Sequence, residues 1–131
     1  MIITSGKRKT AIAKASIKEG TGKVTVNKKT IESFPMLQQL EMKEPLILAE
    51  QVLGKLGFDI SVRVTGGGMS SRIEATRLAI ARAIVEFTKD EKVRAAFIAY
   101  DRNMLVADTR RKEAYKPGDS KARAKRQTSY R

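Results

Sequence analysis

The clearest strand pattern in the chain is Phe58-Asp-Ile-Ser-Val-Arg-Val-Thr65, which is followed by the Gly66-Gly-Gly68 turn and a helical segment. Apolar and polar residues alternate strictly along this stretch, which predicts a strand with one buried face. Arg63 belongs to the polar face, so we expect its side chain to point away from the core. In residues 69–88 one stripe at helical spacing holds Met69, Ile73, Ile80, Ile84 and Phe87, which predicts a helix that packs on the sheet through this stripe.

Two further strands are predicted before this stretch. Residues 10–18 and 23–27 have the composition of strands, and residues 19–22 contain the glycines of a turn, so the pair is predicted to form a β-hairpin. Between the hairpin and the long strand, Pro45 is an acceptable first residue for an amphipathic helix that ends near Gly54.

The remaining pattern places a short helix over residues 90–100 and a turn at residues 101–103 that leads into the apolar residues 104–106. The apolar pattern ends beyond residue 107. We therefore expect an α+β fold in one domain over residues 1–107, with a mixed or antiparallel sheet of roughly four strands covered on one face by helices. Residues 108–131 are expected to form an extended basic tail.

Charge is the first indication of function. The 131 residues include 27 Lys or Arg and 14 Asp or Glu, a net charge of +13. Residues 108–131 hold 9 basic and 3 acidic side chains, so the tail carries +6 and the domain the remaining +7. The tail has no Ile, Leu, Val, Met or Phe, so its own burial cannot offset the entropy lost on ordering. A bound polyanion can, which favours nucleic-acid binding over a tail that only adds solubility.

The absence of two residue types excludes many enzyme classes. The sequence has no Cys and no His, which removes disulfides, zinc fingers, thiolate nucleophiles and imidazole bases. The acidic residues show no metal-ligand spacing, so we expect no catalysis, no metal or other cofactor and no small-molecule substrate. The longest apolar stretch, residues 45–49, is too short for a membrane span, and the first residues lack the apolar core of a signal peptide. We expect a soluble, cytoplasmic protein without a membrane partner.

Two motifs are candidate phosphate contacts. Gly66-Gly-Gly68 precedes a helix, where bare backbone N–H groups attract anions, although a tight strand-to-helix turn explains the same glycines. As a dinucleotide fingerprint the motif is incomplete, because Ser71 stands where the third glycine is required. Lys7, Arg8 and Lys9 come just before a strand and are interpreted as phosphate clamps, with a solvated basic patch as the alternative.

One stripe of the helix over residues 69–88 combines small and basic residues. Arg72, Ala75, Ala79 and Arg82 follow one another at helical spacing. Small residues between cations allow a helix to lie close to a phosphate backbone, which is one interpretation. The alternative is that both alanines touch another element and the arginines are merely solvated.

Four motifs, taken in order, resemble one known family. They are Gly6-Lys-Arg-Lys-Thr-Ala-Ile-Ala13; Gly66-Gly-Gly68 with the helix that carries Ala75-Thr-Arg77 and Ala79-Ile-Ala-Arg82; Tyr100-Asp-Arg-Asn-Met-Leu-Val-Ala-Asp-Thr-Arg110; and the ending Lys121-Ala-Arg-Ala-Lys-Arg-Gln-Thr-Ser-Tyr-Arg131. Over nearly its whole length the chain resembles the S-nine family of small-subunit ribosomal proteins. The last two motifs are similar to archaeal or eukaryotic members, and an archaeal source is preferred.

The resemblance implies a structural protein of the small-subunit head, which binds the 3′ major domain of the small-subunit rRNA beside other head proteins. It implies a left-handed β-α-β crossover, and a tail that threads through rRNA toward the peptidyl-site tRNA. The rRNA contacts expected from the motifs and the resemblance are Lys7, Arg8, Lys9, Arg63, Gly66, Gly67, Gly68, Arg72, Arg77, Arg82, Arg102, Arg110, Arg111, Lys112, Lys116, Lys121 and Arg123. The tRNA contacts that it implies are Lys125, Arg126, Tyr130 and Arg131.

The chain departs from the family pattern in three places. Arg72 stands where the family usually has Gln, Gly118-Asp-Ser-Lys121 replaces a Gly-Gly-Pro-Gly-like stretch, and Arg126 replaces an aromatic residue. Two rival functions also stay open from the residues alone. One is a nucleic-acid chaperone or architectural protein without a unique site, and the other is a nucleotide-using enzyme built on residues 66–68.

Overall fold

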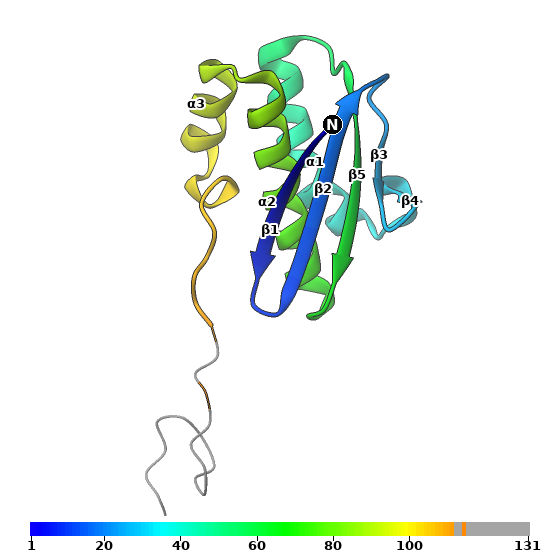
Figure 1. Cartoon of the computed structure of the whole chain (residues 1–131), viewed down its shortest axis with the longest axis vertical. Helices are drawn as coiled ribbons and strands as arrows, with labels where there is room; N and C mark the ends of the chain where they lie inside the picture. The colour runs from blue at the N-terminus through cyan, green and yellow to red at the C-terminus, as the bar shows by residue number, and fades with distance from the viewer. Residues whose placement is uncertain (112–113, 115–131) are drawn as a thin grey trace, which may run out of the picture.

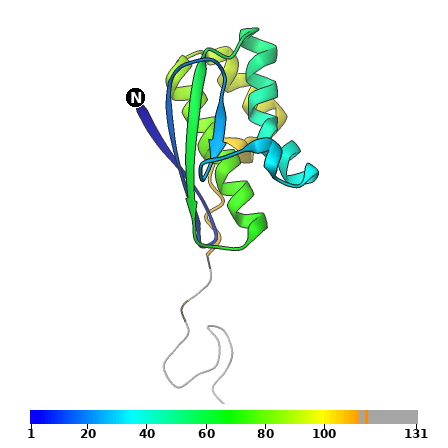
Figure 2. The ribbon, with the colours of Figure 1, turned by 90° about the vertical axis from the view of Figure 1, so that its right-hand side faces the viewer.

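The computed structural model describes residues 1–111 and residue 114, and Figure 1 shows a sheet and three α-helices in one domain. The elements in chain order are β1 (Ile2–Arg8), β2 (Ala11–Glu19), β3 (Val24–Val26), β4 (Lys29–Thr30), the 3-10 helix η1 (Ile31–Ser33), α1 (Met36–Leu53), β5 (Phe58–Thr65), α2 (Met69–Thr88), α3 (Glu91–Tyr100) and the 3-10 helix η2 (Arg102–Met104). The α+β class is confirmed, with five strands where roughly four were expected. The α-helices lie on one side of the sheet, as predicted (Figure 2).

The strand order in the sheet is β1-β2-β5-β3-β4. β2 pairs antiparallel with both β1 and β5, whereas β5 runs parallel to β3. Because β3 and β5 are parallel neighbours, the chain between them crosses over through α1. This is the β-α-β crossover that the resemblance implies, and its left-handed sense stays a prediction.

The predicted hairpin is wrong, although both of its segments are strands. β5 lies between β2 and β3, so the two segments do not pair with each other. The Asp59 carboxylate holds the intervening turn against the start of β5, because it accepts the backbone N–H groups of Thr21, Gly22 and Lys23 at 2.9, 3.1 and 2.9 Å. These bonds join residues 36 to 38 positions apart, so a local turn pattern could not indicate them.

Asp59 also makes the fold sensitive to acid. The backbone N–H of Lys23, and then those of Thr21 and Gly22, hold the pKa of this carboxyl below its ordinary value of 3.8. A lowered folded-state pKa means that the ionised carboxylate stabilises the fold above about pH 4, and that this contribution is lost as the pH falls through the folded-state pKa. The β3 edge is therefore expected to loosen first in acid.

We expect Asp59→Asn to lower the free energy of unfolding at pH 7, because a neutral amide oxygen is a weaker acceptor for three N–H groups. Urea unfolding at several pH values measures the effect. The difference between the parent and variant chains is expected to shrink as the pH falls through the folded-state pKa, where the parent carboxyl becomes neutral too. A difference that does not change with pH would contradict the role given to the ionised form.

β1 was not predicted as a strand, and its packing explains why. Its buried positions are Thr4 and Gly6, and the half-buried Ile2 is the one large apolar residue on the same side, so no alternation of large apolar residues marks it. The Thr4 hydroxyl donates a hydrogen bond to the carbonyl of Ala79 at 3.0 Å, and Gly6 lies directly against the backbone of α2 at Ala75 and Ala79. β1 is thus a strand built for close approach to a helix.

This packing also corrects the prediction for the small-residue stripe of α2. Ala75 and Ala79 are fully buried under β1, so this stripe does not offer an open face to a phosphate backbone. Ile73, Ile80 and Ile84 are buried as predicted, but Met69 at the start of the helix is exposed. The alternative interpretation is right that the alanines touch another element, but Arg72 and Arg82 are not merely solvated, because both donate hydrogen bonds to backbone carbonyls.

α1 begins at Met36 rather than at Pro45, which lies inside the helix. Pro35 takes the N-cap position, and its carbonyl accepts the N–H of Gln39 at 2.9 Å. Pro45 costs the helix one backbone hydrogen bond. The burial of Met42 and Leu46 on the core offsets that cost, which is why the helix continues through the proline.

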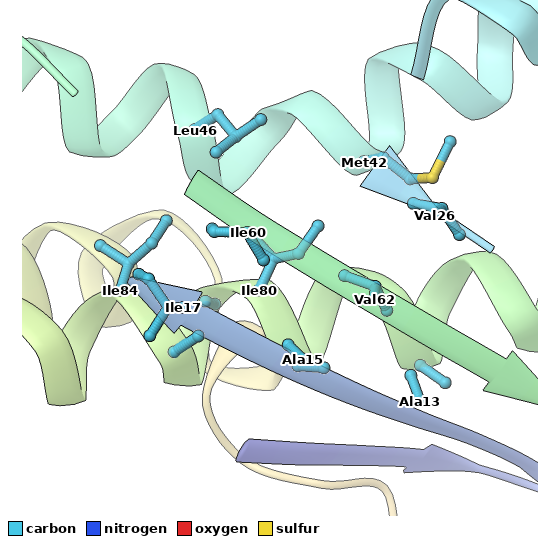
Figure 3. Packing of buried hydrophobic residues seen from close by; sticks show 14 of the residues in the cluster. Ala13, Ala15, Ile17, Val26, Met42, Leu46, Ile60, Val62, Ile80 and Ile84 are labelled. Carbon is cyan, nitrogen blue, oxygen red and sulfur yellow. The ribbon is translucent and has the colours of Figure 1, made fainter. Parts of the chain in front are cut away.

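The core lies between the sheet and the α1 and α2 helices (Figure 3). Ala13, Ala15 and Ile17 from β2 face α2, whose Ile80 and Ile84 are fully buried. Small residues on the strand allow α2 to pack close to it. With this face covered, Lys14, Ser16 and Lys18 of β2 lie on the opposite face.

Candidate nucleic-acid interface

The face of the sheet turned away from the helices is the first candidate surface. We call it the open sheet face and define it by Lys7 of β1, Ile12, Lys14, Ser16 and Lys18 of β2, and Asp59, Ser61, Arg63 and Thr65 of β5, where Asp59 is the cross-strand partner of Lys18. The outward position of Arg63 that the alternation predicted is confirmed. None of the four cations on this face makes an ion pair with another described residue.

Two of these cations stand directly opposite each other. In the antiparallel pairing of β2 and β5, Lys14 is the partner of Arg63. Like charges at such a position repel and destabilise a sheet. Lys7 lies near this pair, because its partner Ile12 is only two residues before Lys14. A bound anion would relieve the repulsion, so this arrangement favours a polyanionic ligand on the open sheet face.

A second candidate surface lies where the turns of the sheet meet. We call it the turn end: the β1–β2 turn at Lys9 and Thr10, the glycine turn at residues 66–68, and the start of the tail at residues 108–111. All three lie at the same end of the domain in Figure 1. A Cβ atom at Gly66 would lie 2.6 Å from the Thr10 carbonyl oxygen, so the glycine turn packs directly on the β1–β2 turn.

The glycines of the turn are explained by their backbone. Gly66 and Gly67 have φ values of 75° and 69°, and a Cβ at Gly67 would lie 2.8 Å from the Cβ of Ala11. Gly68 caps α2 and has open space around it. Arg72 donates from Nε to the Gly66 carbonyl at 2.9 Å, so this guanidinium braces the turn. The tight-turn interpretation is therefore supported, and phosphate contact by residues 66–68 stays a prediction.

Arg8 connects the domain to the tail. Its guanidinium lies 2.6 Å from the Glu74 carboxylate and 3.3 Å from that of Asp108. Asp108 also pairs with Arg110 at 2.7 Å. The Arg110 side chain first, then its backbone N–H, and finally the charge of Arg8 hold the pKa of Asp108 well below its usual range. Asp108 thus stays ionised and fixes the point at which the tail leaves the domain.

Two other predicted arginines are also used within the domain. Arg77, half-buried on α2, pairs with Glu44 of α1 at 2.6 Å and with Asp101 at 3.3 Å. Arg82 donates to the carbonyls of Leu105 at 3.2 Å and Ser5 at 2.9 Å. These contacts hold α1, β1 and the region after α3 onto α2. Contact with rRNA by either arginine stays a prediction, and their intramolecular role is the one that the geometry shows.

The predicted residues therefore fall into groups. Lys7, Lys9 and Arg102 are exposed and unpaired within the described part of the chain, and Arg63 belongs to the open sheet face. Arg111 is exposed at the turn end and bonds only backbone carbonyls. Eight predicted contacts lie outside the described residues: Lys112, Lys116, Lys121, Arg123, Lys125, Arg126, Tyr130 and Arg131.

Lys14 and Lys18 were not among the contacts predicted from the sequence. A lysine on the polar side of a strand looks like an ordinary solvated residue, and only the pairing register places Lys14 against Arg63. The alternation of Lys14, Ser16 and Lys18 with apolar residues was the sequence signal that could have placed both lysines on the polar side of the strand. Within the described residues, no helix is long and apolar enough to cross a membrane, and no three His, Cys, Asp or Glu side chains are grouped to hold a metal.

Comparison with known proteins agrees with these features. The model of the family described as ribosomal protein S9/S16 matches residues 6–131. The small ribosomal subunit proteins uS9 of three strains of Methanococcus maripaludis are each 47% identical over 134 residues, which cover 100% of this chain and 98% of theirs. The family indicated by the sequence motifs and its archaeal character are thereby confirmed: the chain belongs to the ribosomal protein S9/S16 family.

Proposed function

We propose that the chain is a non-catalytic structural protein of the small ribosomal subunit in the cytoplasm. It binds small-subunit rRNA in the head, within the 3′ major domain, beside other head proteins. The observation that carries the proposal is the pairing of Lys14 with Arg63 on the open sheet face, in a chain of this family. A sheet that places two cations side by side without a carboxylate between them is suited to a phosphate backbone.

The body is proposed to dock with two surfaces at once. The open sheet face supplies Lys7, Lys14, Lys18 and Arg63, and the turn end supplies Lys9 and Arg111. Such contacts read the backbone and shape of folded RNA rather than its base sequence. The ion pairs of Arg8 with Glu74 and Asp108 hold the end of β1, α2 and the start of the tail together, so less ordering of the turn end is required on binding.

The tail is proposed to thread through rRNA and to contact the peptidyl-site tRNA with its last residues. Its nine cations supply the electrostatic part of the binding, and its lack of large aliphatic side chains suits a path lined by RNA. The Arg8–Asp108 contact at 3.3 Å supports this proposal, because it anchors the first residue of the tail to the body at the turn end.

Sedimentation of the tagged chain in a native-host extract tests the proposal. We expect the chain to migrate with the small subunit and, after nuclease treatment, to protect one region of head rRNA. The rival chaperone function predicts protection scattered over unrelated nucleic acids. Free sedimentation would refute the ribosomal proposal itself.

The tail tip can be tested separately. Deletion of residues 129–131 is expected to leave assembly with rRNA intact, because both proposed docking surfaces of the body remain. Retention of tRNA in the peptidyl site is expected to weaken, since Tyr130 and Arg131 are lost. Filter binding of tRNA to subunits that carry the deletion measures this. Unchanged tRNA affinity would remove the tip from the tRNA site.

A further inference from the structure

A stripe of apolar side chains on α1 is left exposed by the fold. Met36, Leu37, Leu40 and Ile47 lie on one side of the helix, and their exposed fractions are 75, 76, 52 and 46%. We call these four residues the α1 stripe. The core side of α1, with Met42, Leu46 and Ala49, lies on a different side of the helix. Exposed apolar groups gathered on one element mark interaction sites more often than chance surface residues do.

The charge around the α1 stripe is opposite to that of the rest of the domain. α1 carries Glu41, Glu44 and Glu50 against one cation, Lys43, which gives a net charge of −2, and Glu32 adds another carboxylate in η1. Every helix or strand of the described chain other than α1 and η1 has at least as many cations as carboxylates.

Part of this acidic charge has no internal partner. Glu44 pairs with Arg77 and Glu32 with Lys43, but Glu41 and Glu50 make no ion pair with any described residue. α1 also lies on the far side of the molecule from the open sheet face (Figure 2). The domain therefore presents a cationic side that attracts phosphate and an apolar, acidic side that repels it.

We propose that the α1 stripe docks a basic segment of a neighbouring ribosomal protein. The segment places apolar side chains on Leu37 and Leu40, and a Lys or Arg near Glu41 or Glu50. This inference rests on the proposed ribosomal function, and it adds the surface and the chemistry of one protein partner. Apolar anchors with opposite charges at their rim are the usual anatomy of such an interface.

Two other occupants match the apolar and acidic character of the α1 stripe less well. The basic tail of this chain has the right charge, but residues 108–131 contain no Ile, Leu, Val, Met or Phe to cover the stripe. A second copy of the chain would bring two helices of net charge −2 together, which is unfavourable. A separate protein with cations and aliphatic side chains in one segment meets both requirements.

Photo-crosslinking in native-host small subunits tests this proposal. A benzophenone amino acid is placed at position 37 of the tagged full-length chain, and in a matched control at position 12 on the open sheet face. After irradiation, we expect position 37 to yield an adduct with a peptide of another ribosomal protein that contains Lys or Arg, and position 12 to yield an rRNA adduct.

The outcomes separate this inference from the proposed function. An rRNA adduct, or no adduct, from position 37 in subunits whose position 12 joins rRNA would overturn the α1 inference alone. A tagged chain that never sediments with the small subunit would overturn both proposals.

A second variant measures the contribution of the stripe. With the benzophenone at position 47 as the reporter, Leu37→Ser combined with Leu40→Ser is expected to lower the yield of the protein adduct several-fold. Ile98→Ser, at a comparably exposed position on α3, should leave the yield unchanged. Equal yields in the double variant and the Ile98→Ser control would contradict the proposed interface.

Discussion

Gly6→Ala is expected to destabilise the domain by about 3 kcal/mol, at the upper end of the usual cost of overpacking. An added Cβ would overlap the carbonyl oxygen of Ala75 and lie 2.8 Å from the backbone nitrogen of Ala79. Both are main-chain atoms of the buried helix α2, so no side chain can rotate to make room. β1 must then move away from α2, and the hydrogen bond from Thr4 to Ala79 is lost with it.

Equilibrium urea unfolding followed by circular dichroism measures this effect. Gly57→Ala is the matched control, because a Cβ at Gly57 would have no heavy atom within 4 Å. The control is expected to remain within about 0.5 kcal/mol of the parent, as surface substitutions usually do. If Gly6→Ala unfolds like the control, then β1 does not approach α2 as closely as the structure indicates.

Gly6 also shows where sequence patterns stop predicting the fold. β5 and α2 were predicted with their observed bounds, because each has one apolar face and one polar face that local periodicity reveals. The fully inward positions of β1 are Thr4 and Gly6, and Ile2 on the same side is only half-buried, so the packing of β1 depends on its fit to α2 more than on hydrophobic burial. The same contact explains why Ala75 and Ala79 of α2 were predicted to face RNA. Small residues on a helix look alike in sequence whether they face a strand or an RNA backbone.

Long-range contacts explain why the predicted hairpin was wrong. Asp59 gathers three N–H groups from the turn after β2, and the Asn27 side chain bonds both the N–H and the carbonyl of Val64. These contacts insert β5 between two strands that are neighbours in sequence. The same glycine-containing turn fits a hairpin of β2 and β3 as well as an arrangement with β5 between them. Only the strand pairing distinguishes the two.

The candidate site was predictable in its charge but not in its geometry. Net charge and basic motifs indicated a nucleic-acid ligand, and the alternation in β5 placed Arg63 outward. Sequence could not tell a cation that is free to bind from one already used: Arg77 and Arg82 look the same as Arg63 in a list of basic residues. Packing separates them, because the first two bond carboxylates or carbonyls of other elements.

The substitutions Lys14→Gln and Arg63→Gln, made together, are expected to weaken rRNA binding on the order of 100-fold at low salt. This estimate takes the lower range for two hydrogen-bonded contacts to a charged group, about 1.5 kcal/mol each. Loss of two phosphate contacts should also make the slope of log affinity against log salt shallower by about 1.4 to 1.8. Filter binding to head-domain rRNA over a range of salt concentrations measures both.

The same pair of substitutions should have the opposite effect on the free protein. Because Lys14 and Arg63 are cross-strand partners, removing both charges relieves their repulsion, and the free energy of unfolding should rise. Lys92→Gln with Arg94→Gln removes the same charge from exposed positions of α3 and is expected to alter neither the stability nor the specific affinity appreciably. A higher free energy of unfolding together with a lower affinity for rRNA would indicate that the fold keeps two repelling cations side by side because they bind an RNA phosphate. If both double variants lose the same affinity for rRNA, then the net charge of the protein alone determines that affinity, and the open sheet face is not the docking surface.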